Sequence, residues 1–141
     1  MKKILIAFVA LVLLFPSAYA QKKGAKNYVV GFYNLENLFD TYNDPAKNDE
    51  EFLPEGKNKW TDVKYQKKLT NMAKVIKSMK EANGAWHALL GVSEIENRLV
   101  LEDLVMDPQI AEANYQIVHY DGPDRRGVDV ALLYNPKVFK F

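Results

Sequence analysis

One amphipathic helix between two apolar strands is the feature that most restricts how this chain can fold. The helix is predicted to begin at Thr61 and Asp62, a capping residue followed by an acid in the first turn, and to end at Asn83 and Gly84. The residues of its apolar stripe recur at steps of three and four: Tyr65, Leu69, Met72, Val75, Ile76 and Met79. The lysines on its other side are predicted to face solvent rather than to bind phosphate: Lys64, Lys67, Lys68, Lys74, Lys77 and Lys80.

The helix is flanked by segments rich in apolar, aromatic and β-branched residues. Residues 28–33 and 85–92 have this composition and are predicted to be buried strands. The further elements expected are, in chain order, a long loop over 40–59, a short helix over 98–106, strands over 115–120 and 128–134 joined by a hairpin-like turn, and the start of another strand at Val138. This succession predicts an α/β fold of the α+β kind.

The first twenty residues have the three parts of a secretory signal peptide. Lys2 and Lys3 give a positive start, an apolar run follows, and Ala18-Tyr19-Ala20 is a small-x-small cleavage site. The apolar run is shorter than the roughly 20 residues that a spanning helix needs, which disfavours the alternative of an uncleaved anchor. We therefore expect residues 1–20 to be removed, a polar leader over 21–27, export to the periplasm or beyond the cell, and no stable membrane span after cleavage.

Charge and cysteine content exclude several classes of protein. The chain has 19 basic and 18 acidic residues, so the loss of Lys2 and Lys3 leaves 17 against 18. A near-neutral chain has no overall positive electrostatic field that would attract nucleic acid or an anionic membrane. Phosphate chemistry would therefore need a local site or a metal. The chain has no cysteine, which excludes disulfides and thiolate metal sites.

Carboxylates follow the two predicted strands that flank the long helix. Asn34 and Glu36 come after the first strand, and Glu94 and Glu96 come after the second. Polar groups at strand ends, held by a rigid sheet, are where α/β folds place many of their sites. Mg²⁺ prefers oxygen ligands and often takes only one or two carboxylates from the protein. Glu94 with Glu36 or Asn34 nearby would meet that need, although acids after strands are also common in exposed loops.

The remaining polar residues are predicted to have structural roles. His87 and His119 lack cysteine partners or the spacing of a helical zinc motif. Arg125 and Arg126 lie in the polar turn and are expected to be solvated. Asp129 lies inside an apolar strand, where an ionised side chain needs a partner, and either arginine could provide one.

Three segments together resemble the endonuclease/exonuclease/phosphatase family, which includes DNase I-like nucleases and inositol phosphate phosphatases. Residues 32–39 (FYNLENLF) are similar to the first motif of the family, and residues 91–98 (GVSEIENR) to the second. Residues 124–134 (DRRGVDVALLY) are similar to its central hairpin. The resemblance covers nearly all of residues 28–141, in the order of the family.

The resemblance implies a DNase I-like four-layer α/β/β/α sandwich that hydrolyses phosphoesters with Mg²⁺, or with Mn²⁺ in its place. It implies that Glu94 is the metal ligand, that Glu36 stands where relatives often carry a second acid, and that Asn34 helps to orient the metal site. Glu94 and Asn34 are thus the expected catalytic residues, and no other cofactor is expected.

The resemblance also implies that part of the active site is missing. The later Asp-x-Asn and Asp-His motifs of the family are not found before Phe141. Residues 28–141 are therefore predicted to be the N-terminal portion of a truncated domain, with little activity alone. The alternatives are a non-catalytic exported binding domain on the same scaffold and a fragment with no independent role. The substrate (DNA, RNA, a sugar phosphate or a lipid head group) and the oligomeric state stay open.

Overall fold

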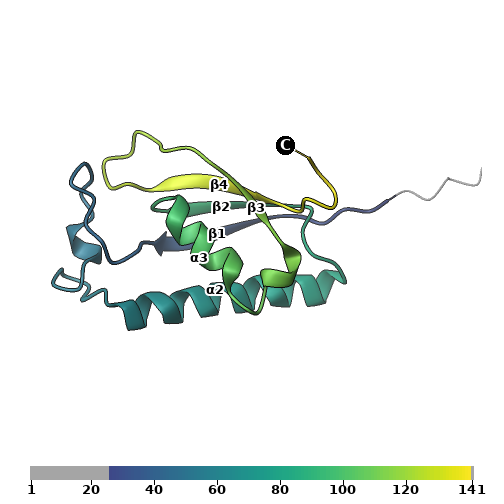
Figure 1. The fold of residues 1–141 in the computed structure, drawn as a ribbon, viewed down its shortest axis with the longest axis horizontal. Helices are drawn as coiled ribbons and strands as arrows, with labels where there is room; N and C mark the ends of the chain where they lie inside the picture. The colour runs from purple at the N-terminus through teal and green to yellow at the C-terminus, as the bar shows by residue number, and fades with distance from the viewer. Residues whose placement is uncertain (1–25, 141) are drawn as a thin grey trace, which may run out of the picture.

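The computed structural model of the chain describes residues 26–140, so the predicted signal peptide and nearly all of the polar leader lie outside the described residues. A sheet of four strands and two helices make up most of this part of the chain (Figure 1). In chain order the elements are β1 (Val30–Leu38), the 3-10 turn η1 (Glu50–Phe52), α2 (Asp62–Asn83), β2 (Leu89–Ile95), α3 (Arg98–Met106), the 3-10 turn η2 (Ala111–Ala113), β3 (Gln116–His119) and β4 (Asp129–Tyr134).

The strands lie in the order β1-β2-β4-β3. The strands β1 and β2 are parallel, with α2 in the connection between them, whereas β4 runs antiparallel to both β2 and β3. One end of the sheet therefore holds the last residues of β1, β2 and β3 and the first residues of β4. We call this line of strand ends the carboxyl edge. The long loop after β1 and the β3–β4 connection both extend from this edge (Figure 1).

One face of the sheet is covered by α2 and α3. Leu69 and Ile76 of α2 and Leu101 of α3 are buried against strand residues such as Leu90 and Leu133. The left-handed residue Gly84 (φ 72°) ends α2, as the sequence predicts. The first turn of α3 is capped by Asn97, whose side chain accepts a hydrogen bond from the Val100 amide at 3.1 Å.

The other face carries exposed apolar side chains. Val30, Phe32 and Val130 are each more than 65% exposed. The strand register aligns Phe32 with Gly91, Gly91 with Leu132 and Leu132 with Val118, so one apolar row crosses all four strands. The described residues thus form two layers, helices on a sheet, with one apolar sheet face open.

Most of the predicted elements are confirmed, and the differences lie at strand ends. Both helices occupy the predicted ranges, and the mixed α/β class is correct. The strand β1 continues to Leu38, so Asn34 and Glu36 lie in its irregular last turn and not after it. The strand β2 begins only at Leu89. The expected strand at Val138 is wrong as far as residue 140, because the amides of Val138 and Phe139 both bond the Asn135 carbonyl in a helical turn.

Candidate functional site

Two neighbouring parallel strands lose their regular pairing at the same level of the carboxyl edge. The register shifts between Asn34 and Leu38 in β1 and between Ser93 and Ile95 in β2. Within these interruptions Glu36 (φ 52°) and Glu94 (φ 57°) have left-handed backbones, a conformation that non-glycine residues rarely adopt. Such strain and such bulges persist only where surrounding contacts hold them, and they concentrate at functional sites.

Asn34 holds the irregular end of β1 in place. Its Oδ1 accepts a hydrogen bond from the Glu36 amide at 2.6 Å. The register pairs Asn34 with Ser93, the residue immediately before Glu94. The structure therefore places the three predicted site residues at adjacent strand ends: Asn34 and Glu36 are exposed, and Glu94 is partly buried.

Lys68 reaches this point from α2. Its Nζ donates to the Glu36 carbonyl and, at 3.2 Å, to the Asn37 carbonyl. Burial lowers the pKa of Lys68, and the carboxylates of Glu36 and Glu94 oppose that shift, so both carboxylates lie near the same ammonium group. The prediction that Lys68 only faces solvent is wrong. Lys68 also lines a shallow hollow of about 330 Å³ together with Glu36, Trp60, Lys64, Lys67, Asn71 and Met72.

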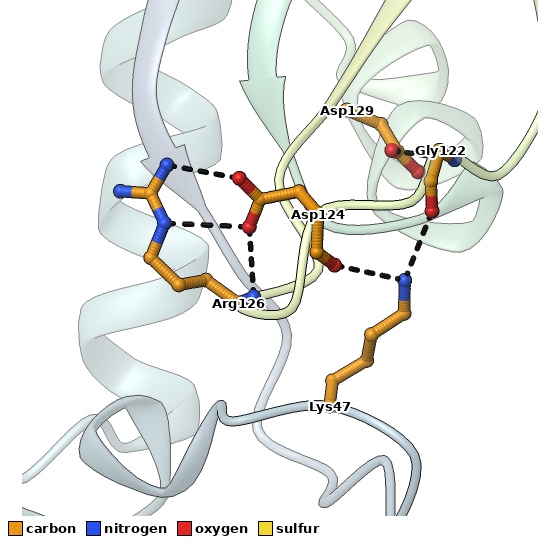
Figure 2. A network of polar contacts seen from close by, with 5 residues as sticks. All are labelled: Lys47, Gly122, Asp124, Arg126 and Asp129. Atoms are coloured by element: carbon orange, nitrogen blue, oxygen red, sulfur yellow. Dashed lines mark hydrogen bonds and ion pairs between the residues drawn. The ribbon is translucent and has the colours of Figure 1, made fainter.

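The β3–β4 connection brings a second cation toward Glu94. Arg126 binds the Asp124 carboxylate through Nε at 3.3 Å and through its terminal nitrogen at 3.2 Å (Figure 2). The pKa of Arg126 is raised chiefly by Asp124, with a smaller contribution from Glu94. Lys47 holds the connection in place, because its Nζ lies 3.3 Å from the carbonyl oxygens of both Gly122 and Asp124 (Figure 2).

Glu96, the fourth carboxylate singled out from the sequence, has a different position. It is 7% exposed, and its Oε2 accepts a hydrogen bond from the Asp40 amide at 2.7 Å. Burial raises the pKa of Glu96 to about 7; the Asp40 hydrogen bond opposes this, and the charges of Asp40, Asp49 and Asp44 add to it. Glu96 therefore ties the long loop to the end of β2 and is not offered to a ligand at the open side of the site.

The donor set at the carboxyl edge suits a hard cation. Glu36 and Glu94 offer carboxylate oxygens and Asn34 an amide oxygen, the ligand types that Mg²⁺ prefers. The strand register brings these residues to neighbouring strand ends, because Asn34 is paired with Ser93, the residue before Glu94. These residues thus fit the predicted magnesium site.

Comparison of the sequence with known protein families gives a match over residues 29–141, to the endonuclease/exonuclease/phosphatase family. The chain belongs to this family. No curated protein and no solved structure matches the chain. Family membership, with the mixed sheet and two helices, identifies the structure as a partial DNase I-like fold. Within residues 26–140, no helix is both long and apolar enough to cross a membrane.

A second polar cluster, between the end of β3 and the start of β4, was not predicted from the sequence. His119 Nε2 lies 3.1 Å from Asp129 Oδ2, and both side chains are 3% exposed. The expected arginine partner of Asp129 is therefore wrong, because Arg126 pairs with Asp124. Asp121 brings a further carboxylate, and one ligand atom from each of the three residues lies within 4.8 Å of the others. The alternation His119-x-Asp121 at a strand end, facing the start of the next strand, is the sequence pattern that could have indicated this group.

His87, the other histidine, is buried on the helix side of the sheet. Burial lowers its pKa, and a Cβ at Gly31 would lie 2.7 Å from His87 Cδ2. The side chain occupies space that only a glycine in β1 leaves free.

Proposed function

We propose that this member of the endonuclease/exonuclease/phosphatase family is an exported, Mg²⁺-dependent phosphoester hydrolase, with Mn²⁺ as an alternative ion. Family membership supports a phosphoesterase or nuclease type of domain. The observation that carries the proposal is the joint interruption of β1 and β2 at the carboxyl edge, which brings the left-handed residues Glu36 and Glu94 to neighbouring strand ends beside Asn34. Export is supported by the signal-peptide pattern of residues 1–20.

In this proposal Glu94 and Glu36 hold the ion, and Asn34 fixes the backbone that carries Glu36. The bound ion supplies Lewis acidity toward a phosphate oxygen and stabilises the leaving oxygen. Lys68 keeps the left-handed turn at Glu36 and Asn37 closed through their carbonyls. Arg126 extends a guanidinium group on the Glu94 side, where it can bind a phosphate oxygen of the substrate.

The described part of the chain holds one portion of such a site. The open apolar face, with Phe32 and Val130 exposed, supports the proposal that further strands pack on this sheet in the complete enzyme. We place the general base and the remaining phosphate contacts on those strands. Loss of a general base alone costs about 10²–10⁴ in rate, so the 141-residue chain by itself should hydrolyse phosphoesters slowly.

The test is a calorimetric titration of Mg²⁺ and Mn²⁺ into the 141-residue chain expressed with its own N-terminal segment. The wild type is compared with Glu94→Gln and with Glu102→Gln, an exposed acid of α3 paired with Arg98. We expect Glu94→Gln to weaken binding at least tenfold and Glu102→Gln to leave it unchanged. The intact mass of the purified protein tests export, because cleavage after Ala20 leaves Gln21 as the first residue.

Circular dichroism of the same samples shows whether the chain is folded. Equal affinities of folded wild type and folded Glu94→Gln would contradict the assignment of Glu94. A folded wild type that binds neither ion would contradict the metal site as a whole.

A further inference from the structure

We propose that His119, Asp121 and Asp129 form a second metal site, which binds Zn²⁺ and is separate from the magnesium site at Glu94. The three residues come from the end of β3, the connection after it and the start of β4. The inference rests on their own geometry and not on the proposed hydrolase activity.

The distances suit one ion. Ligand atoms from the three residues lie within 4.8 Å of one another, and His119 Nε2 lies 3.1 Å from Asp129 Oδ2. Zn²⁺ binds nitrogen and oxygen ligands at about 2.0–2.2 Å, which places two ligands of one ion about 3–3.5 Å apart. The His119–Asp129 pair already has that separation, so a modest movement of the exposed Asp121 side chain would complete a three-ligand set.

The carboxylate of Asp129 is held in the orientation that such a site needs. Its Oδ1 accepts a hydrogen bond from the Gly122 amide at 2.8 Å, and its Oδ2 faces His119 (Figure 2 shows the Gly122 bond). A Cβ at Gly122 would lie 2.6 Å from Asp129 Oδ1, so only glycine permits this approach. Outer hydrogen bonds of this kind orient metal ligands in known sites.

The group differs from an ordinary buried ion pair because it contains two carboxylates and one imidazole. Among residues 26–140, neither Asp121 nor Asp129 forms an ion pair with a lysine or arginine. Two basic side chains close to the β3–β4 connection are engaged elsewhere: Lys47 on the carbonyls of Gly122 and Asp124, and Arg126 on the Asp124 carboxylate (Figure 2). A divalent cation can be bound by the two carboxylates and the imidazole nitrogen together.

The donor set decides which ion is expected. An imidazole nitrogen with two carboxylates suits Zn²⁺ and other first-row transition metals, whereas Mg²⁺ prefers oxygen donors alone. A bound Zn²⁺ would cross-link β3 to β4 and fix the connection that carries Arg126. Three protein ligands would leave a fourth position of the ion for water.

The experiment titrates Zn²⁺ into the 141-residue chain against a chromophoric chelator, with saturating Mg²⁺ present to occupy oxygen-only sites. Asp121→Asn is the principal variant, because an exposed side chain can be changed without loss of the fold. Asp124→Asn, three residues farther along the same connection, is the matched control. Glu94→Gln separates this site from the magnesium site. Co²⁺ absorption bands in the visible region provide a second measurement of ligation.

We expect wild-type protein to bind one Zn²⁺, Asp121→Asn to bind it at least tenfold more weakly, and both Asp124→Asn and Glu94→Gln to stay within about twofold of wild type. His119→Gln should lose the Co²⁺ bands. If that variant does not fold, Asp121→Asn still decides the question. Folded wild-type protein that binds no Zn²⁺ would overturn the proposal, and so would equal affinities of Asp121→Asn and Asp124→Asn.

Discussion

At the residue scale, backbone strain gathers where the chemistry is proposed. Among residues 26–140, five non-glycine residues have positive φ, and three of them are Glu36, Asn37 and Glu94 at the carboxyl edge. Each left-handed non-glycine residue costs on the order of 1 kcal/mol, so local contacts must hold it. Asn34 binds the amide of this turn and Lys68 binds its carbonyls, so donors and acceptors are both satisfied.

Lys68→Met tests how far that turn depends on the ammonium group. Methionine keeps most of the aliphatic stem but leaves the carbonyls of Glu36 and Asn37 without their charged donor. We expect the free energy of unfolding to fall by about 1–3 kcal/mol, the range for a hydrogen bond to a charged group. Urea denaturation measures it, and Lys67→Met, at an exposed neighbouring position, is the control. A loss no larger than that of the control would show that the turn is held by Asn34 and packing alone.

The sequence predicts part of this site and not the rest, for a physical reason. Asn34 and Glu94 are recognisable because a polar residue directly after an apolar run is a local pattern, although both lie within their strands. Lys68 is not, because its spacing along α2 is the same as that of lysines that face solvent. The His119–Asp129 contact depends on the pairing of β3 with β4, which brings together residues ten positions apart.

At the scale of elements, the long loop after β1 is fastened at two places. Glu96, directly after β2, binds the Asp40 amide, and Asn97 Nδ2 donates to the Asp40 carboxylate at 3.0 Å. Farther along, Lys47 binds carbonyls of the β3–β4 connection, and the Asn48 amide donates a hydrogen bond to the Arg125 carbonyl at 2.8 Å. The loop thus joins the end of β2 to the turn that carries Arg126, so its docking should affect the geometry of the site.

Burial of Glu96, which accepts the hydrogen bond from the Asp40 amide, makes the free energy of unfolding depend on pH. The pKa of Glu96 is about 7 in the folded chain and about 4.3 in an unfolded one, so between these values the folded state binds more protons. The contribution of Glu96 to stability is therefore present below about pH 4 and is lost as the pH rises toward 7. We expect this loss to be about 1–3 kcal/mol.

Glu96→Gln isolates that contribution, because glutamine stays neutral and retains an oxygen for the Asp40 amide. The difference in unfolding free energy between variant and wild type should grow in favour of the variant from pH 5 to pH 8. Denaturant unfolding at four pH values measures it, with Glu102→Gln as the matched surface control. The comparison with wild type matters because buried His87, whose pKa is lowered, makes stability rise with pH below about 6.5. A difference that stays constant with pH would contradict the origin assigned to it.

Element boundaries were predictable where local chemistry determines them. The helix α2 starts after Thr61 and stops at Gly84, because a capping residue and a left-handed glycine act within one turn. The start of β2 was misplaced by four residues, since Ala85 to Ala88 are apolar enough to resemble a strand. Only His87 and Ala88 of this segment are buried, whereas Ala85 is exposed, a tertiary arrangement that composition alone does not specify.

At the scale of the whole molecule, only one face of the sheet is covered in the part of the chain that the structure describes. The helices bury one face, whereas the other presents the apolar row through Phe32, Leu132 and Val118, with Val30 and Val130 exposed beside it. Alternation along β1 and β4 is therefore apolar on both sides, the pattern of strands buried on two faces. This two-sided pattern indicates that the open face of the sheet is suited to packing against a further layer. Such packing agrees with the layered architecture that the family resemblance implies.

An uncovered apolar face should make the 141-residue chain self-associate. Contiguous apolar patches promote association in proportion to the area that they can remove from water. We expect sedimentation velocity to show association that increases with protein concentration, and Phe32→Lys to reduce it by placing a charge at the β1 end of the row. Because Phe32 is 67% exposed, the variant should keep its unfolding free energy within about 1 kcal/mol of wild type. Val63→Lys, at an exposed apolar position of α2 on the other side of the sheet, should associate as wild type does. Monomeric wild type at all concentrations, or equal association of the two variants, would show that this face does not drive contact between chains.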